Sequence, residues 1–235
     1  MNIVSFENVS KTYRIGEVDV TALSQVSFGI SKGGFAALVG PSGSGKTTAL
    51  NLIGCLDSPT AGEVIVAGQP VSRLDRRRGA QFRGEKLGFV FQDFNLLPVL
   101  TVFENVEYPL LMIRDMPRGE RRPAVERVLE AVGMTDQAGK YPAQLSGGQK
   151  QRAAIARALV GNPELVLADE PTANLDGATA QRVMSLMKRM RDVFGTTFVF
   201  STHDPRIMDQ AEATFYLEDG RLLDAPTAYG EDRHA

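Results

Sequence analysis

The chain has 235 residues, a length that predicts one domain or two small ones and that is enough to bury a hydrophobic core. With 43% hydrophobic and 23% charged residues, its composition is that of an ordinary soluble globular protein. A net charge of −2 gives no reason to expect nucleic-acid binding, and one cysteine with two histidines excludes an internal disulfide and a Cys/His zinc site. No apolar run approaches the roughly twenty residues of a spanning helix, and no secretory signal is visible. We therefore expect a cytosolic chain that docks at a membrane if it works there.

Short strands of two kinds are predicted along the chain. Three segments alternate apolar and polar side chains with a period of two, as half-buried strands do: 2–6, 25–30 and 63–66. Three others are continuous apolar runs, as in strands covered on both faces: 35–39, 165–168 and 197–200. Polar or glycine-rich turns end these runs, and helical patterns follow the first two. This succession indicates an open parallel sheet, whose ligands bind beyond the carboxyl ends of its strands.

Three helices are predicted from apolar residues that fall on one face. The first follows Lys46 and carries Leu50, Ile53 and Leu56; the second follows Ser146 and stops at Gly161-Asn162-Pro163. The third is marked by Val183, Leu186, Met187, Met190 and Val193. Between about residues 93 and 140, prolines are expected to punctuate short helical pieces: Pro98, Pro109, Pro117 and Pro123. We interpret that stretch as a helical insertion within the same domain.

A phosphate-binding loop lies between the first apolar run and the first helix. The residues fit the pattern G-x-x-x-x-G-K-[ST]: Gly40-Pro41-Ser42-Gly43-Ser44-Gly45-Lys46-Thr47. Glycines let consecutive backbone N–H groups turn toward the phosphates, and the following helix points its positive end at them. We expect Lys46 to reach the β- and γ-phosphates and the Thr47 hydroxyl to hold Mg²⁺, with Thr48 also at the ATP site.

The second half of a nucleotide site follows the apolar run 165–168. A hydrophobic strand that ends in a carboxylate places Asp169 against the magnesium ion. Glu170 stands one residue further out, where it can orient or deprotonate a water for in-line attack. Together the two motifs predict hydrolysis of a nucleoside triphosphate by positioning and charge stabilisation.

Between those halves stands Leu145-Ser146-Gly147-Gly148-Gln149, and with it the chain resembles the ATP-binding cassette (ABC) ATPases over essentially its whole length. The resemblance implies an α/β fold: a P-loop NTPase (RecA-like) core with a mixed sheet, an antiparallel β subdomain and a helical subdomain. It further implies one ABC ATPase domain over 1–235, with the core at about 1–92 and 161–235 and the helical subdomain at about 93–160.

Further matches come in the family's order, and the resemblance assigns each a role. Gln92 looks like the Q-loop glutamine, which acts in catalysis and binds magnesium with Thr47 and Asp169. Asp176 belongs to a D-loop, and His203 looks like the switch histidine, catalytic beside Glu170. Tyr13 is placed like the aromatic residue that stacks on adenine, with packing within its strand as the alternative. The cofactors implied are ATP and Mg²⁺.

The signature residues 145–149 open a helix of their own, which makes a second anion-binding site from a helix N-terminus. One nucleotide hardly needs two such sites from one chain. The resemblance implies the explanation: an ATP-dependent head-to-tail homodimer, in which the signature of one subunit closes on the γ-phosphate held by the P-loop of the other. No nucleic-acid partner is expected.

Short motifs resemble one branch of the family, the macrolide-exporter and lipoprotein-release ATPases: Gly54-Cys55-Leu56-Asp57, Asp169-Glu170-Pro171-Thr172 and Thr202-His203-Asp204-Pro205. That branch implies an integral-membrane permease as partner, here a separate chain, and a peripheral location on the cytoplasmic face of the membrane. The alternative is an FtsE-like regulatory ATPase that signals through an FtsX-like membrane partner without moving a substrate. The ATPase residues would be identical, so only the partner separates the two.

The family's docking groove for the permease lies between the core and the helical insertion, lined by the segment after Gln92. Here that segment, 94–103, is unusually apolar for a connection, and local core packing is an equally good interpretation. The run Arg76-Arg77-Arg78 is compatible with anionic lipid, but a solvated face is the favoured interpretation.

Overall fold

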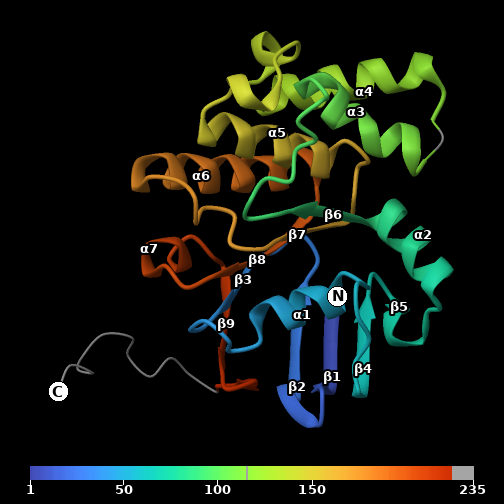
Figure 1. Ribbon diagram of the computed structural model, residues 1–235, viewed down its shortest axis with the longest axis vertical. Coiled ribbons are helices and arrows are strands. Elements are labelled where there is room, and N and C mark those ends of the chain that lie inside the picture. Colours follow the sequence, from blue (N-terminus) through green and yellow to red (C-terminus); the bar gives the residue numbers. More distant parts are fainter. Residues whose placement is uncertain (115, 224–235) are drawn as a thin grey trace.

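The computed structural model describes residues 1–114 and 116–223. A six-stranded sheet lies at the centre of the molecule, with helices above it and an antiparallel sheet below it in the view of Figure 1. The order of its strands is β10 (Arg221–Leu222), β9 (Ala213–Glu218), β3 (Phe35–Val39), β8 (Thr197–Thr202), β7 (Leu165–Ala168) and β6 (Leu87–Val90). All neighbours are parallel except β10 and β9, so the sheet is mixed, as the family resemblance implies.

The continuous apolar strands serve two cores at once. Phe35, Ala37 and Val39 of β3 face a core built with the helices above the sheet. Ala36 and Leu38 of the same strand face a second core, shared with α1 and the antiparallel sheet. Strands β7 and β8 divide their side chains in the same way. Burial on both faces is therefore the reason that these strands are apolar without alternation.

The antiparallel sheet contains longer strands than the alternating pattern predicts. Its order is β2 (Val18–Ser31), β1 (Asn2–Ile15), β4 (Ala61–Val66) and β5 (Gln69–Pro70). The β1–β2 register shifts between Phe6 and Val9, and again between Val9 and Lys11 and between Lys11 and Thr12. A further shift lies between Asn2 and Val4, and Ile3 and Val4 are both buried, so the predicted period of two fails within segment 2–6. It holds along segment 25–30, where Val26, Phe28 and Ile30 are buried or half-buried between exposed residues.

The predicted helices are present, with two corrections at their ends. They are α1 (Lys46–Ile53), α5 (Gly147–Leu159) and α6 (Gly177–Phe194). Leu56 was expected on the buried face of the first helix, but α1 ends at Gly54 and Leu56 is 51% exposed in the following loop. Val193 was expected on the buried face of the third, yet it is 61% exposed because α6 buries its apolar side only as far as Met190.

In the insertion the prolines do not all interrupt helices. Two α-helices form, α3 (Val102–Met112) and α4 (Arg118–Ala131), with 3₁₀ turns η2 (Thr135–Gln137) and η3 (Pro142–Gln144). Pro109 and Pro123 lie inside α3 and α4, where they were expected to separate shorter pieces. An interior proline costs about 3 kcal/mol, but buried side chains on both sides, Val106 and Leu110 in α3, hold the helix together.

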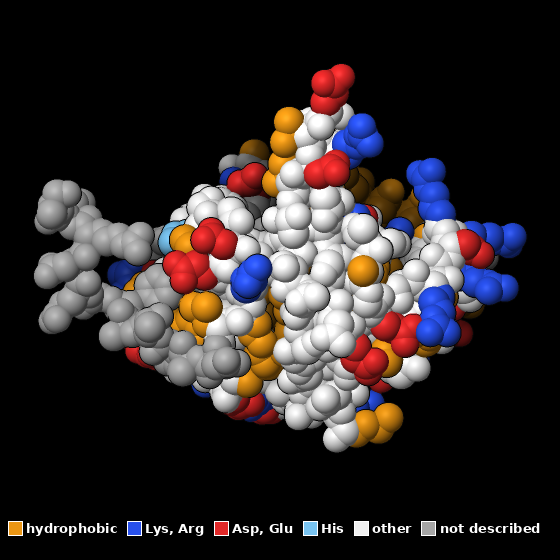
Figure 2. All heavy atoms as spheres, turned by 90° about the horizontal axis from the view of Figure 1, so that it is seen from below, with side chains coloured by type: hydrophobic (Ala, Val, Ile, Leu, Met, Phe, Trp, Pro, Cys, Tyr) orange, Lys and Arg blue, Asp and Glu red, His pale blue; other side chains and the backbone are white. Residues whose placement is uncertain are grey.

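Other elements gave no apolar period and were not predicted: α2 (Arg76–Lys86), α7 (Pro205–Met208), the 3₁₀ turn η1 (Val71–Arg73) and strands β5, β9 and β10. Only Gly79 of α2 is buried. The basic run 76–78 opens α2, and Figure 2 shows Lys and Arg side chains gathered on the side where α2 lies in Figure 1. Within 1–114 and 116–223, no helix is long and apolar enough to cross a membrane.

Candidate active site

The phosphate-binding loop connects β3 to α1 in a conformation that requires glycine. Gly40, Gly43 and Gly45 have φ angles of 155°, 82° and 104°, outside the range that side chains favour. A Cβ on Gly40 would lie 2.0 Å from the Leu217 carbonyl oxygen, and one on Gly45 would lie 2.6 Å from that of Ala22. The loop therefore has no room for side chains at these two positions, which leaves its backbone to face a ligand.

Lys46 is buried within this loop, with only 6% of its surface exposed. Its Nζ donates to the carbonyl oxygens of Gly40 at 2.7 Å and Pro41 at 2.8 Å. Burial lowers the pKa of this ammonium, against the opposing effect of the Glu170 and Asp169 carboxylates. Within the described residues, the buried hydroxyl of Ser44 has no hydrogen-bond partner. A buried ammonium and a hydroxyl without a partner in a glycine-rich loop are suited to bind a triphosphate. On binding, Lys46 would exchange its contacts with the two carbonyl oxygens for contacts with phosphate oxygens.

Asp169 and Thr47 meet where the magnesium site is expected. Asp169 follows β7 and its backbone N–H is held by the Val90 carbonyl, which fixes the carboxylate at the sheet edge. The Thr47 hydroxyl lies 3.3 Å from both carboxylate oxygens of Asp169. A hydroxyl and a carboxylate at one point suit Mg²⁺, which takes oxygen ligands and keeps several waters.

Glu170 and His203 form the second carboxylate contact of the site. Glu170 Oε1 lies 2.8 Å from His203 Nδ1, and the Glu170 backbone has a φ of 46°, a left-handed conformation that is costly away from glycine. The Ser201 hydroxyl accepts from the Glu170 N–H at 2.8 Å and donates to Asp169 Oδ1 at 2.6 Å. Ser201 thus joins the two acidic residues. Ser201 was not predicted as a site residue, although its position directly after the apolar run 197–200 was the available signal.

A cavity of about 440 Å³ collects most of the predicted ATP-site residues. Its walls include Ser42, Gly43, Gly45, Lys46, Thr47, Thr48, Gln92, Asp169, Glu170 and His203. Gly40, Pro41 and Ser44 belong to the same loop but do not line the cavity; Gly40 and Ser44 are buried and Pro41 is exposed. Tyr13 does not line the cavity; it stands on β1, against the loop that follows α1.

The signature residues line a different cavity of about 400 Å³. Ser146 caps α5: its hydroxyl accepts from the Gln149 N–H at 3.3 Å, and its own N–H donates to the side-chain oxygen of Gln149. Gly147, Gly148 and Asp176 share this cavity, whereas Leu145 is buried in the core. The Asp176 carboxylate caps α6, and its hydrogen bonds with Thr179 lower its pKa. One chain therefore carries two separate cavities with the backbone geometry of anion sites.

The family with the description "ABC transporter" matches residues 23–173, more than half of the chain. The chain belongs to the ABC transporter family, and it is an ATP-binding ATPase of that family. It is 46% identical over 220 residues to an uncharacterized ABC transporter ATP-binding protein of Thermotoga maritima, covering 94% of this chain and 93% of that one. It is 45% identical over 225 residues to MJ0796 of Methanocaldococcus jannaschii, covering 94% and 95% respectively.

A third relative is the macrolide export ATP-binding/permease protein MacB of Syntrophobacter fumaroxidans, 43% identical over 98% of this chain but only 32% of MacB. Among solved structures, the chain resembles the dimeric post-hydrolysis state of the cassette MJ0796 bound to ADP and Pi, with a TM-score of 0.84, 45% identity and coverage of 93% of this chain and 96% of that one. The structure of cbiO1 from Clostridium perfringens, part of the ABC transporter complex cbiONQ, gives a TM-score of 0.85 at 28% identity, over 94% of this chain and 87% of that one. These relatives agree with the macrolide-exporter and lipoprotein-release branch.

Proposed function

We propose that this ATPase forms a head-to-tail homodimer on ATP and powers an integral-membrane permease of the export or lipoprotein-release type from the cytoplasmic face of the membrane. The observation that carries the dimer is the pair of separate anion cavities on one chain. The dimeric structures of MJ0796, at 44% and 45% identity, support it. Each nucleotide would then lie between the P-loop of one copy and the signature helix of its partner.

In this proposal the residues of the 440 Å³ cavity divide the work of hydrolysis. The P-loop N–H groups and Lys46 bind the phosphates, and Thr47, Asp169 and Gln92 would hold Mg²⁺, which neutralises charge on the β- and γ-phosphates when bound. Glu170 orients the attacking water and accepts its proton. His203, already 2.8 Å from Glu170, steadies that carboxylate and can donate to the transferring phosphoryl group. Tyr13 would stack on the adenine base.

The E170Q variant tests the dimer and the role of Glu170 together. Without the carboxylate, turnover is expected to fall about a hundredfold or more, so ATP persists and holds the two copies together. Gel filtration with light scattering in ATP should then show a dimer, and the control E218Q, at an exposed glutamate, should turn over normally. A solely monomeric E170Q in saturating ATP would contradict the composite site.

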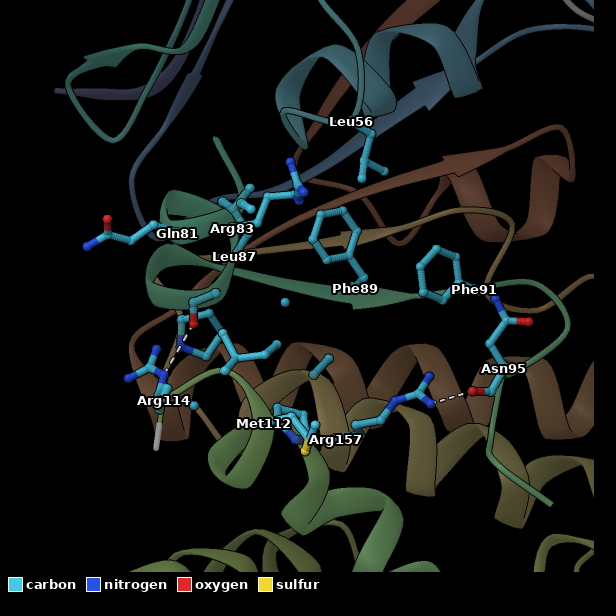
Figure 3. A pocket seen from close by; sticks show the side chains of 18 residues that line it. Leu56, Gln81, Arg83, Leu87, Phe89, Phe91, Asn95, Met112, Arg114 and Arg157 are labelled. Carbon is cyan, nitrogen blue, oxygen red and sulfur yellow. Dashed lines mark hydrogen bonds between the residues drawn. The ribbon is translucent and has the colours of Figure 1, made fainter. Parts of the chain in front are cut away.

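A third cavity, of about 700 Å³ and separate from the two anion cavities, is the proposed docking groove for the permease. Figure 3 shows Phe89 and Phe91 pointing into it from β6 and its end, with Leu56 on one side and Met112 of α3 on the other. Three arginines complete the wall: Arg83 of α2, Arg157 of α5 and Arg114 of the loop after α3. An occupant with apolar side chains to fill the centre and a carboxylate or free carbonyls toward the arginines fits this surface.

The segment 94–103, expected to line the groove, contributes only Asn95. Leu96 and Phe103 pack against the helical core instead, whereas Leu97 and Val99 are 38% and 78% exposed, so local packing accounts for only part of that segment. Arg157 connects the groove to the segment after Gln92: its guanidinium donates to the carbonyls of Phe94 and Asn95, as the dashed line in Figure 3 marks for Asn95. Phe94 and Asn95 have φ angles of 63° and 47°, so this backbone is held in a costly conformation. A partner in the groove would thus touch the side chain that holds the Q-loop.

The groove is tested with the integral-membrane protein encoded beside this chain. Leu56→Glu places a charge on the groove wall and should abolish co-purification of the two proteins while the ATPase activity of the free chain is kept. Val20→Glu, at a 44% exposed position of the β1–β2 hairpin, is the matched control and should co-purify normally. Unchanged co-purification of Leu56→Glu would contradict the groove. A four-helix neighbour with a large external domain would favour the export branch.

A further inference from the structure

Tyr13 lies on a part of β1 that pairs with β2 but not with β4. Strand β4 pairs with β1 only as far as Ser10, whereas β2 pairs with it to Ile15. The end of this hairpin is open, with Ile15 67% and Val18 64% exposed. A ring that receives a flat base must be held in place, because an unfixed side chain loses rotamer freedom when the ligand binds. The structure contains contacts that fix this one.

The loop after α1 makes hydrogen bonds to four successive residues of β1, which are residues 10–13. Thr60 N–H donates to the Ser10 carbonyl at 2.8 Å, and Thr12 N–H donates to the Thr60 hydroxyl at 3.0 Å. Lys11 Nζ lies 2.6 Å from Asp57 Oδ1 and 2.8 Å from the Ser58 carbonyl. The Tyr13 hydroxyl donates to Asp57 Oδ2 at 2.9 Å. Asp57 therefore binds Lys11 and Tyr13 at the same time, one with each carboxylate oxygen.

Lys11 also contacts the tyrosine directly. Its Nζ lies 4.8 Å from the centroid of the Tyr13 ring, within the range of a cation–π interaction. An ammonium over one face leaves the opposite face for a base. Burial would raise the pKa of Asp57, but hydrogen bonds from Lys11, the Ser58 backbone and Tyr13 outweigh it and lower the pKa, so this carboxylate is charged at neutral pH.

We propose that Asp57 and Lys11 are positioning residues that fix the Tyr13 ring as the adenine platform at a set distance from the P-loop. Lys46 begins α1 and Asp57 lies in the loop directly after it, so both the base and the phosphates would be located from a single helix and the loop that follows it. The inference rests on the proposed stacking role of Tyr13. Since the contacts act on the base alone, their loss weakens nucleotide binding without weakening phosphate binding.

Calorimetry of ADP and, separately, of inorganic pyrophosphate, both with Mg²⁺, tests this inference on the full chain. D57N should weaken ADP binding roughly 3- to 10-fold, as expected when hydrogen bonds that fix the ring are lost, and leave pyrophosphate binding unchanged. D19N, which makes the same charge change at an exposed position of the hairpin, should change neither. In a Y13A background, where ADP binding is already weakened, D57N should have no further effect.

Each other result overturns a different statement. Equal weakening of ADP and pyrophosphate binding would show that Asp57 supports α1 and the P-loop rather than the ring. An unchanged ADP affinity of D57N, with Y13A weakened, would remove the positioning role and leave Tyr13 as the platform. An unchanged ADP affinity of Y13A would remove the stacking role of Tyr13 first, and the positioning role with it. Melting temperatures of all variants confirm that each is folded.

Discussion

At the scale of single residues, Ser201 connects the two carboxylates of the site. Its hydroxyl donates to Asp169 and accepts from the Glu170 backbone, and the side chain is completely buried. The Glu170 backbone is left-handed, so this hydrogen bond holds a conformation that the chain would otherwise leave. Ser201 therefore positions both residues although it does not itself line the 440 Å³ cavity.

Ser201→Ala is expected to lower kcat about 10- to 100-fold with a smaller change in KM, because a buried N–H loses its acceptor and Glu170 loses its position. Steady-state ATPase kinetics measure the two constants. Thr196→Val is the matched control: Thr196 is also fully buried before the same strand, but its hydroxyl has no hydrogen-bond partner among the described residues. Parallel losses in the two variants would show that Ser201 acts only through the packing of β8.

Lys46→Ala is expected to weaken ATP binding itself, at least tenfold, because a buried charge aimed at the phosphates is removed. Lys140→Ala, at an exposed lysine far along the chain, should leave the affinity unchanged. Calorimetry with ATP at pH 7 compares the two variants with the parent chain. If Lys46→Ala keeps its affinity and loses only turnover, the loop is not the phosphate site that we propose.

At the residue level, the sequence is most informative where a motif is local. The P-loop and the pair Asp169-Glu170 each span a few neighbours, and their spacing alone identifies the chemistry. The contacts of Ser201 and Asp57 were missed because their partners lie 31 to 46 positions away in the chain. Such contacts depend on which strands become neighbours, and that is decided by tertiary packing.

At the scale of elements, one side chain organises the connection into the helical part of the chain. Asn105 of α3 is completely buried. Its Oδ1 accepts from the Leu97 N–H at 2.7 Å, and its Nδ2 faces the carbonyls of Leu97, Leu100 and Thr101 at 3.1, 3.0 and 2.9 Å. A connection without regular structure thereby has its backbone groups satisfied, as burial requires.

Asn105→Ala should therefore destabilise the fold by about 2–3 kcal/mol, since one N–H and several carbonyls lose their partner at once. For a chain of this size that corresponds to a drop in Tm of roughly 4–10 °C. Differential scanning calorimetry measures it, with Gln181→Ala on the exposed side of α6 as a control of near-zero effect. A Tm for Asn105→Ala within a degree of the parent value would show that the connection needs no such support.

The elements that were predicted differ from those that were missed in how much apolar surface they bury. Strands β3 and β7 match their predicted limits because both faces are buried and polar turns end them. Helix α2 was missed because only Gly79 of its residues is buried, so no apolar face marks it in the sequence. The prediction that prolines interrupt the helices was wrong for the opposite reason. In α3, the burial of side chains outweighs the local preference of Pro109 for a helix end.

At the scale of the whole molecule, the two anion cavities make a prediction about mixing inactive chains. Ser146→Arg damages only the signature, and Lys46→Ala damages only the P-loop. In a mixed dimer, the P-loop of the first variant meets the signature of the second, and that site is intact. Ser146 also caps α5, and the loss of this cap costs about 1 kcal/mol of stability. The melting temperature of Ser146→Arg is therefore measured first, to show that the variant is folded.

Each variant alone should lack ATPase activity, and an equal mixture should recover up to about a quarter of the parent rate, because half of the dimers are mixed and half of their sites are intact. Mixing Lys46→Ala with Glu170→Gln is the control. Both changes lie in the P-loop half of the site, so every composite site in that mixture stays damaged and no activity should return. Recovery in the control mixture would mean that Lys46 and Glu170 act in different composite sites of the dimer. No recovery in the test mixture, with two folded variants that bind each other, would mean that each chain completes its own site. The signature cavity would then need a different ligand.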